Sequence, residues 1–193
     1  MADSPHPRAV IVRHGETEWS RAWRHTGRTD LPLTAEGRAR AENLRSRLSR
    51  RQFALVLTSP LQRARTTAAL AGFPHAEVCE DLLEWDYGDD EGRTSAEIRE
   101  ERPGWLIWTD GPKNGETIDQ VAERADRVIR RILSAGGDTL CFAHGHILRI
   151  LAARWIDSPP QLAQRLLLAT AAPSTLGWEH DYRAIERWSC DAD

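Results

Sequence analysis

Arginine and histidine side chains follow three apolar segments of this chain that the sequence predicts as buried strands. Arg13 and His14 follow the first segment, Arg63 comes shortly after the second, and His144 follows the third. A charged side chain is costly to bury without a partner, so this placement predicts an anionic ligand. Arginine supplies bidentate contacts to phosphate oxygens, and a histidine nitrogen can attack phosphorus to form a covalent intermediate. The residue types therefore indicate phosphoryl-transfer chemistry.

Strands and helices that alternate along the chain must position these side chains. Apolar runs predict strands over residues 9–12, 53–57 and 139–143, a short strand and turn within 76–85, and a closing hairpin over 174–188. Helical spacing predicts helices over residues 35–50, 59–70, 95–101, 116–135 and 147–155, with Ser59 as the N-cap of the second. This order predicts a three-layer α/β sandwich with a mostly parallel central sheet and helices on both faces. No linker or repeat interrupts residues 1–193, so a single domain is expected.

The carboxyl ends of the predicted strands are expected to meet in one crevice. In open α/β sheets, ligands bind outside these ends. The second and last strands also lead into predicted helix N-termini, whose free N–H groups favour an anion. Two arginines, two histidines and two helix starts would then surround one crevice, an arrangement that suits a phosphate group.

Composition and charge restrict the classes of function. The chain has 193 residues, of which 40% are hydrophobic and 28% charged, and its formal net charge is −3. These values are typical of a globular protein, and the interspersed charges predict neither a nucleic-acid partner nor a membrane surface. The N-terminal segment has no hydrophobic signal region, and Cys79, Cys141 and Cys190 have neither zinc nor disulfide spacing. We therefore expect a cytoplasmic protein without a cofactor.

A set of motifs in a fixed order carries a resemblance to a known family. Within residues 11–149 the chain contains "RHGETEW", "TGRTDLPLTAEGRARA", "TSPLQRARTTA", "EWDYGDDEG" and "FAHGHILR". One short motif such as RHG has little specificity, whereas five in order are specific. The chain resembles the histidine phosphatase superfamily, also called phosphoglycerate mutase-like. More narrowly, "TEWS", "IWTDGPKNGET" and "HGHILR" resemble the branch with sedoheptulose-1,7-bisphosphatase and low-specificity acid phosphatases, which points to a sugar phosphate as substrate.

The resemblance implies a role for each matching residue. His14, the histidine of the RHG motif, would be the nucleophile and would become phosphohistidine. Arg13 and Arg63 match the arginines that clamp the phosphate, and His144 matches the second histidine, which hydrogen-bonds the transferring phosphoryl group. Glu84 matches the carboxylate that protonates the leaving oxygen.

Four further positions match the family's substrate-binding segments. Thr26 and Gly27 match the loop that closes on the substrate, and Gly145 lies beside the second histidine. Ser20 stands where many relatives have asparagine, and its hydroxyl could still donate to phosphate. We expect these four residues to contact the substrate.

The chemistry places its own demands on the nucleophile and the acid. His14 must be neutral to attack, and nearby cations are expected to lower its pKa. Its other ring nitrogen needs a partner, for which the carbonyl of Gly15 is the candidate. Glu84 must carry a proton to act as an acid, and it is flanked by Leu82, Leu83 and Trp85. No metal is expected, because arginine and histidine supply the positive charge.

Several neighbouring residues have a simpler interpretation. Most of the acids around Glu84 are interpreted as ordinary loop acids; they are Asp81, Asp86, Asp89, Asp90 and Glu91. His146 is interpreted as a helix-start residue near the pocket, and Glu116 as a carboxylate that opens the long helix, where it suits the dipole. Trp105 and Trp108 are expected in core or lid packing rather than on a ligand.

The sequence therefore predicts a metal-independent phosphomonoesterase that acts through phosphohistidine on a small phosphorylated metabolite. Phosphoglycerate mutase is the first alternative, although such mutases usually carry a longer insertion after the glutamate loop. A non-catalytic phosphate-binding protein on the same scaffold is the second, and the intact set of site residues argues against it. A metal site at His144 and His146 is a third, but two ligands are too few. The oligomeric state stays open, with a homodimer as one option.

Overall fold

A six-stranded sheet forms the centre of the protein, in a computed structural model that describes residues 6–190. Its strand order is β3-β2-β4-β1-β5-β6. The strands are β1 (Ala9–Arg13), β2 (Leu55–Thr58), β3 (Glu77–Val78), β4 (Thr139–Ala143), β5 (Pro173–Glu179) and β6 (Tyr182–Arg187). The first four run parallel, and β5 and β6 close the sheet as an antiparallel hairpin. The sheet is thus mostly parallel, as predicted.

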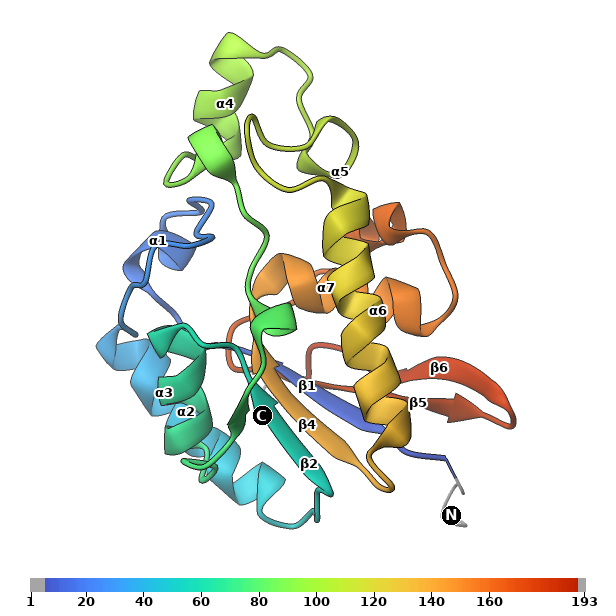
Figure 1. Ribbon diagram of the computed structural model, residues 1–193. Coiled ribbons are helices and arrows are strands. Elements are labelled where there is room, and N and C mark those ends of the chain that lie inside the picture. Colours follow the sequence, from blue (N-terminus) through green and yellow to red (C-terminus); the bar gives the residue numbers. More distant parts are fainter. Residues whose placement is uncertain (1–5, 191–193) are drawn as a thin grey trace.

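Helices cover both faces of the sheet (Figure 1). The α-helices are α1 (Glu18–Arg21), α2 (Ala35–Leu48), α3 (Gln62–Leu70), α4 (Ser95–Glu101), α5 (Ile107–Asp110), α6 (Ile118–Ser134) and α7 (Gly145–Trp155). Short 3-10 helices are η1 (Glu80–Leu82), η2 (Gly88–Asp90) and η3 (Pro160–Arg165). Helices α2 and α3 pack on one face and α6 and α7 on the other, while α4 and α5 form a projection at the top of Figure 1.

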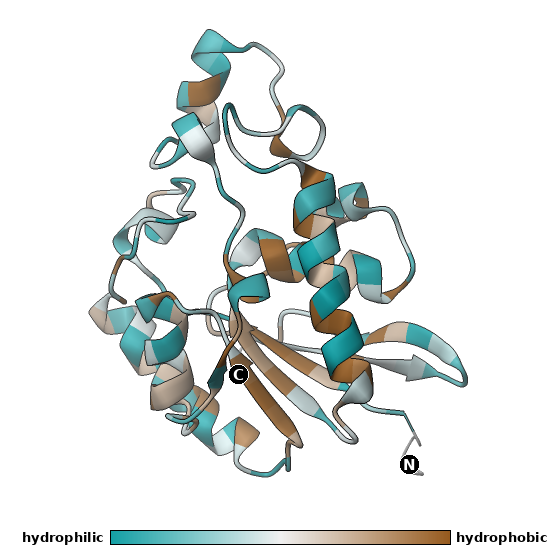
Figure 2. Cartoon of the chain, in the orientation of Figure 1, coloured by the Kyte–Doolittle hydropathy of each residue, from teal (hydrophilic) through white to brown (hydrophobic). Residues whose placement is uncertain are grey.

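Alternating strand residues build the two halves of the core. Val10 and Val12 of β1 point into the cluster that includes Leu44 and Leu48 of α2. Ile11, between them, points into the larger cluster with α6 and α7. Successive side chains of a strand point to opposite faces, so a strand covered on both sides is apolar throughout. Figure 2 shows this pattern as brown strands between helices that carry hydrophilic residues outward. The predicted three-layer α/β architecture is confirmed.

Local boundaries differ from the prediction at two helix starts. Helix α3 begins at Gln62 behind Leu61, with no side-chain cap, so the expected capping by Ser59 is wrong. The Ser59 hydroxyl instead forms a hydrogen bond with Nε2 of His144, at 2.7 Å. Helix α7 begins at Gly145, two residues earlier than expected. Helix α1, between the first predicted strand and the predicted helix 35–50, was not predicted.

The long helix α6 is confirmed, but its start is built differently from the prediction. Thr117 and Gln120 form a capping box at its N-terminus. The carboxylate of Glu116 does not serve the helix N–H groups. It forms an ion pair with Arg124, which lies further along the helix, with an N–O distance of 2.8 Å. Among residues 6–190, no helix is long and apolar enough to cross a membrane.

Candidate active site

The residues that follow the three central parallel strands lie side by side. The backbone N–H of His14, after β1, donates to the carbonyl of Ala143 in β4 at 2.9 Å. The N–H of Ser59, after β2, donates to Phe142 of β4, also at 2.9 Å. The rings of His14 and His144 are 5.2 Å apart between centroids, in an edge arrangement. The expected meeting of strand ends in one place is therefore observed.

A pocket of about 560 Å³ opens at these strand ends. This volume is within the usual range of small-molecule sites, roughly 300–1,000 Å³. Of the residues predicted for the site, the pocket is lined by Arg13, His14, Ser20, Thr26, Glu84 and Gly145. Three others are buried and do not line the pocket; they are Arg63, His144 and Gly27. The fold thus gathers the predicted residues, but only part of them at the surface of the pocket.

The hydrogen bonds of His14 determine which ring nitrogen can react. Its Nδ1 lies 2.7 Å from the carbonyl oxygen of Gly15, the partner expected from the sequence. A carbonyl only accepts, so Nδ1 carries the proton and Nε2 keeps its lone pair. Burial, and then the charges of Arg63 and Arg13, hold the pKa of His14 well below its usual value. The imidazole is therefore neutral and has its free nitrogen available for attack.

Arg13 carries a buried donor that no described residue accepts. Its Nη1 donates to the carbonyl of Leu168 at 2.8 Å. Its Nε is buried, and within residues 6–190 it has no hydrogen-bond partner. A β-carbon built on Gly145 would lie 3.4 Å from this Nε, so the glycine leaves the space beside the donor free of a side chain. An unpaired buried donor costs roughly 1–3 kcal/mol, which an oxyanion in the pocket would recover.

The Glu84 carboxylate is held by the N-terminus of α7. Its Oε1 accepts the N–H groups of Trp85 and Ile147, at 3.0 and 2.9 Å. Its Oε2 accepts the N–H of His146 at 3.0 Å, which leaves a second acceptor position on that oxygen. Gly145 separates this oxygen from Arg13, since its β-carbon position is 3.7 Å from Oε2. The acid and the arginine therefore flank one space.

The backbone around Glu84 is fixed from behind by an ion pair. Arg124 donates to the carbonyl of Leu83 at 2.8 Å and pairs with both carboxylate oxygens of Glu116. Glu116 in turn accepts the N–H of Asp86 at 2.9 Å. The pair thus orients the segment that carries the acid, a role that sequence reasoning did not assign to either residue.

Arg63 and His144 form a buried network instead of a pocket wall. Nε of Arg63 donates to Nδ1 of His144 at 3.0 Å, so the histidine proton lies on Nε2 and is donated to Ser59. Burial and Arg63 lower the pKa of His144 well below its usual value. The other nitrogens of Arg63 donate to the carbonyls of Thr26, Gly27 and Thr29. Direct contact of these two residues with phosphate stays a prediction.

Glu91 holds the loop that contains Thr26 and Gly27. Its carboxylate accepts the N–H of Gly27 at 2.9 Å and that of Thr29 at 3.0 Å. A β-carbon on Gly27 would come within 2.6 Å of the backbone carbonyl oxygen of Trp85, so only glycine fits there. Nearby Asp90 is buried and accepts the N–H of Lys113 at 3.0 Å. Glu91 and Asp90 therefore have structural roles, and they are exceptions to the interpretation of most acids in this segment as ordinary loop acids.

Ser20 lines the pocket, but its hydroxyl is committed to the start of α1. It accepts the N–H of Thr17 at 2.9 Å and donates its proton to the Thr17 carbonyl at 3.0 Å. This capping box occupies the donor that was expected to face phosphate.

Several pocket residues were missed by sequence reasoning. They are Ala22, Trp23, Arg24, His25, Tyr87, Thr94, Ser95, Ala96, Arg149 and Leu168. Tyr87 and Arg149 lie inside motifs that were recognised, so their place in "EWDYG" and "HGHILR" was a usable signal. Ser95 and Leu168 come from distant segments and had none.

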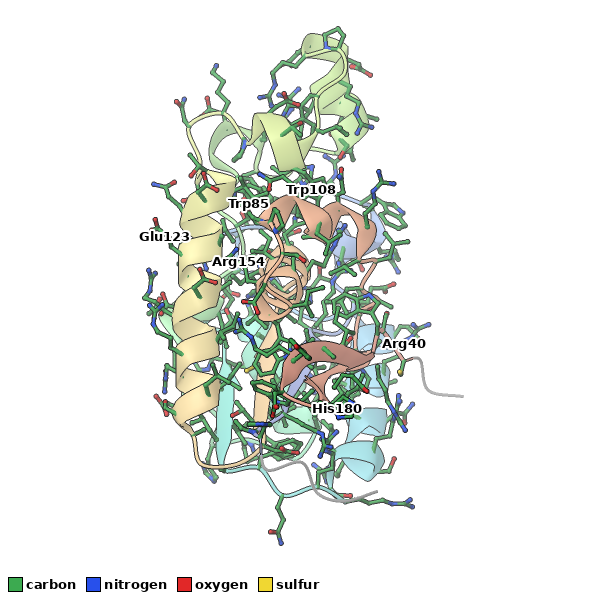
Figure 3. The ribbon with its side chains drawn as sticks, turned by 90° about the vertical axis from the view of Figure 1, so that its right-hand side faces the viewer. Arg40, Trp85, Trp108, Glu123, Arg154 and His180 are labelled. Atoms are coloured by element: carbon green, nitrogen blue, oxygen red, sulfur yellow. The ribbon has the colours of Figure 1, made fainter. Side chains whose placement is uncertain are left out.

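His146 and the tryptophans agree with their simpler interpretation. His146 lies at the start of α7, where its ring contacts the Tyr87 hydroxyl. Trp105 and Trp108 are buried in the larger core cluster. Figure 3 shows Trp108 next to Trp85, and the centroids of their rings are 5.9 Å apart. Within residues 6–190, no three His, Cys, Asp or Glu side chains gather as a metal site would require.

Comparison with known proteins assigns the family. The sequence profile described as "Histidine phosphatase superfamily (branch 1)" matches residues 9–191. The chain belongs to the histidine phosphatase superfamily. Phosphatases and phosphoglycerate mutases are both among the superfamily members that it matches.

Three relatives place the chain more closely within this superfamily. It is 40% identical over 182 residues to an acid phosphatase from Mycobacterium tuberculosis, covering 92% of this chain and 90% of the relative. It is also 40% identical over 183 residues to sedoheptulose 1,7-bisphosphatase from Saccharomyces cerevisiae, covering 77% and 67%. The solved structure of an open reading frame product from M. tuberculosis superposes with a TM-score of 0.90 at 39% identity, covering 95% and 97%. These relatives support a phosphatase.

Proposed function

We propose that this histidine phosphatase hydrolyses a sugar phosphate through a phosphohistidine at His14, without a metal ion. The observation that carries the proposal is the pairing of two groups in one pocket. His14 offers a neutral ring with its lone pair on Nε2, and Arg13 offers a buried Nε with no partner among the described residues. A phosphate ester suits both groups, because its phosphorus can be attacked by His14 and its oxygens can accept from Arg13.

The reaction proceeds in two displacements. The phosphate accepts from Arg13, and Nε2 of His14 attacks phosphorus while the bond to the ester oxygen breaks. Glu84 gives the leaving oxygen a proton from Oε2, so the sugar departs as an alcohol. Water then attacks the phosphohistidine, and the ionised Glu84 takes its proton. Inorganic phosphate leaves, and both residues return to their starting states.

Arg63 and His144 stabilise the charge of the phosphoryl group from behind His14. For the contact implied by the family resemblance, the Nε2–H of His144 exchanges the Ser59 hydroxyl for a phosphoryl oxygen. Preorganised donors of this kind typically contribute about 3–4 kcal/mol each to the transition state. Thr26, Gly27 and Gly145 shape the substrate side of the pocket, and Ser20 would have to release its Thr17 contact to donate there.

The sugar phosphate is favoured by the relatives and by the size of the pocket. One relative is named for a sugar bisphosphate, and about 560 Å³ is more space than a phosphate group alone requires. Phosphoglycerate mutases are also relatives, and a mutase would return the phosphoryl group to an acceptor instead of water. The proposal includes a cytoplasmic location. A homodimer is one option for assembly, and light scattering on the purified protein tests it.

Trapping the intermediate tests the proposal. Purified protein is supplied with a panel of labelled phosphorylated metabolites, with and without EDTA, and quenched. We expect turnover that survives EDTA and a protein-bound phosphate that is labile in acid and stable in base. His14→Ala should lose both, whereas His75→Gln, on the exposed loop before β3, should keep both. Normal turnover by the His14→Ala protein, or dependence on an added divalent ion, would refute the mechanism.

A further inference from the structure

Trp23 lies in the wall of the pocket, yet 85% of the residue is exposed. All eight tryptophans of the chain lie within residues 6–190, and Trp23 is the one that is exposed there. Five of the others donate their indole N–H to a backbone carbonyl; they are Trp85, Trp105, Trp155, Trp178 and Trp188. Trp23 forms no such hydrogen bond within the described residues, and it belongs to neither core cluster. Packing of the fold therefore does not explain a tryptophan at this position.

The backbone of Trp23 is in the left-handed region, with a φ of 58°. This conformation is unfavourable for a bulky side chain, whereas glycine and asparagine adopt it readily. The next residue is held in place on two sides: the N–H of Arg24 donates to the carbonyl of Trp19 at 2.9 Å, and Arg24 forms a β-bridge with Thr94. The turn thus presents the indole from a fixed backbone at a cost in stability, as is common for residues of functional sites.

Neutral polar groups accompany Trp23 in this part of the pocket wall. Ser95, at the start of α4, has its hydroxyl 3.3 Å from Nε2 of His25, and both residues line the pocket. Burial lowers the pKa of His25 to about 4, so its ring is neutral at pH 7. The charge of Arg24 is paired with Glu97 at 3.3 Å. Helices α1 and α4, which flank these residues, lie above the sheet in Figure 1. This region therefore offers an aromatic face next to groups that can donate to and accept from hydroxyls.

We propose that Trp23 stacks on the ring of the leaving group, so that the enzyme prefers phosphate esters of cyclic sugars to those of open-chain polyols. A cyclic sugar presents C–H groups on its faces and hydroxyl groups at its edge. The indole covers one apolar face, and Ser95 and His25 exchange hydrogen bonds with the hydroxyls. An open-chain polyol has no such face. This inference rests on the proposed function and adds the form of the substrate.

Matched substrates test the preference. Glucose 6-phosphate is compared with glucitol 6-phosphate, and ribose 5-phosphate with ribitol 5-phosphate; within each pair, the charge and the number of carbons are the same. We expect the wild-type protein to show a higher kcat/KM for the cyclic member of at least one pair. In Trp23→Asn this preference should fall roughly 5- to 50-fold, the usual size of a single aromatic stacking contact. Trp23→Phe keeps an aromatic face and should retain most of the preference.

Thermal unfolding and a second exposed aromatic residue separate binding from structure. Asparagine tolerates the left-handed region, so Trp23→Asn should unfold at the same temperature as the wild-type protein or at a higher one. Tyr182→Ala removes an aromatic side chain that is 77% exposed on β6 and outside the pocket wall, and it should leave the preference unchanged. The inference is wrong if the wild-type protein shows no preference in either pair, or if Asn and Phe at position 23 have the same effect. It is also wrong if Trp23→Asn alters only self-association, as measured by light scattering.

Calorimetry distinguishes failure of this inference from failure of the proposed function. The His14→Ala protein is titrated with glucose 6-phosphate and with glucitol 6-phosphate, with and without Trp23→Asn. Tighter binding of glucose 6-phosphate that disappears with Trp23→Asn supports the inference, even if the wild-type protein hydrolyses neither ester. Hydrolysis of both esters by the wild-type protein, together with equal binding or no binding of the two ligands, would keep the proposed function and refute the role of Trp23.

Discussion

The unpartnered Nε of Arg13 lies 3.4 Å from the position that a β-carbon would take on Gly145. The same position is 3.7 Å from Oε2 of Glu84, so the space of one absent methyl group lies between the Arg13 donor and the Glu84 carboxylate. Both distances are ordinary van der Waals contacts. An added methyl group would therefore fit the fold but occupy the space that the proposed function assigns to the phosphate ester.

Gly145→Ala should reduce activity while leaving stability unchanged or slightly improved. Alanine is a better helix former than glycine by up to about 1 kcal/mol, and Gly145 is the first residue of α7. Loss of the contact between Arg13 and phosphate should lower kcat/KM by roughly 10²- to 10³-fold. Steady-state kinetics and thermal unfolding of the same preparation provide the two measurements. An unaltered kcat/KM would show that phosphate does not enter between Arg13 and Glu84.

Glu84→Gln should separate substrates by the quality of their leaving groups. A sugar alkoxide needs a proton in the transition state, whereas p-nitrophenolate hardly does, and a lost general acid costs roughly 10²- to 10⁴-fold. In the burst phase, alkyl phosphates should therefore lose much more rate than p-nitrophenyl phosphate. A glutamine must also turn its amide N–H₂ toward one of the backbone donors on α7, but this disturbance affects both substrates equally.

Asp86→Asn is the matched control for this acid. Its carboxylate accepts the N–H of Gly88 at 3.0 Å, and the residue does not belong to the pocket wall. The ratio of the two burst rates should stay at the wild-type value. A selective loss for alkyl phosphates in the control, or equal losses in Glu84→Gln, would mean that another carboxylate is the acid.

Glu91→Gln should impair the substrate loop, contrary to the expectation from sequence that acids of this segment are replaceable. Oε1 of Glu91 accepts the N–H groups of both Gly27 and Thr29, and Oε2 shares that of Gly27, so a glutamine would set its N–H₂ group against the Gly27 N–H. The stability loss should be about 1–3 kcal/mol, and KM should rise because Thr26 lines the pocket. Denaturant unfolding and kinetics measure both. Asp89→Asn, at an exposed position on the 3-10 helix η2 that ends just before Glu91, should show neither change; equal effects would argue against a specific role of Glu91.

His25 should make the folded protein less stable in acid. Burial lowers its pKa to about 4, whereas an imidazole in the unfolded chain titrates at about 6.5. Between these values the unfolded chain binds a proton that the folded protein does not, so stability falls as pH is lowered through this window. The contribution is about 3 kcal/mol when complete.

The free energy of unfolding at pH 7 and at pH 4.5 measures this effect. In His25→Gln, the loss of stability between the two pH values should be smaller than in the wild-type protein by most of that amount. His75→Gln, which alters an exposed histidine, should leave the loss unchanged. Identical pH profiles for the wild-type protein and His25→Gln would rule out His25 as the source.

The sequence alone predicted the order of the strands and of the longer helices, and the positions of His14 and His144 at strand ends. Strand β1 is apolar throughout because it is covered on both faces, and this composition is visible without a structure. His14 and its carbonyl partner Gly15 are neighbours in the chain, so their contact follows from local geometry. The parallel sheet then required that the ends of β1 and β4 meet, which placed His14 near His144.

The roles of individual polar side chains depended on the tertiary structure. Ser59 had the sequence signature of a helix cap, yet its hydroxyl contacts His144, which follows 85 positions later. Glu91 had the appearance of a solvated acid, yet it binds Gly27, 64 positions earlier.

Arg149 lies inside a recognised motif, but only the surrounding structure shows that it forms no ion pair among residues 6–190. Hydrophobic periodicity is repeated over many residues and survives local exceptions. A hydrogen bond or ion pair depends instead on a few tenths of an ångström between two atoms that the chain brings together only when the layers pack. For that reason the sequence determined the fold and the place of His14 at the end of β1, whereas packing decided which charged side chains are paired.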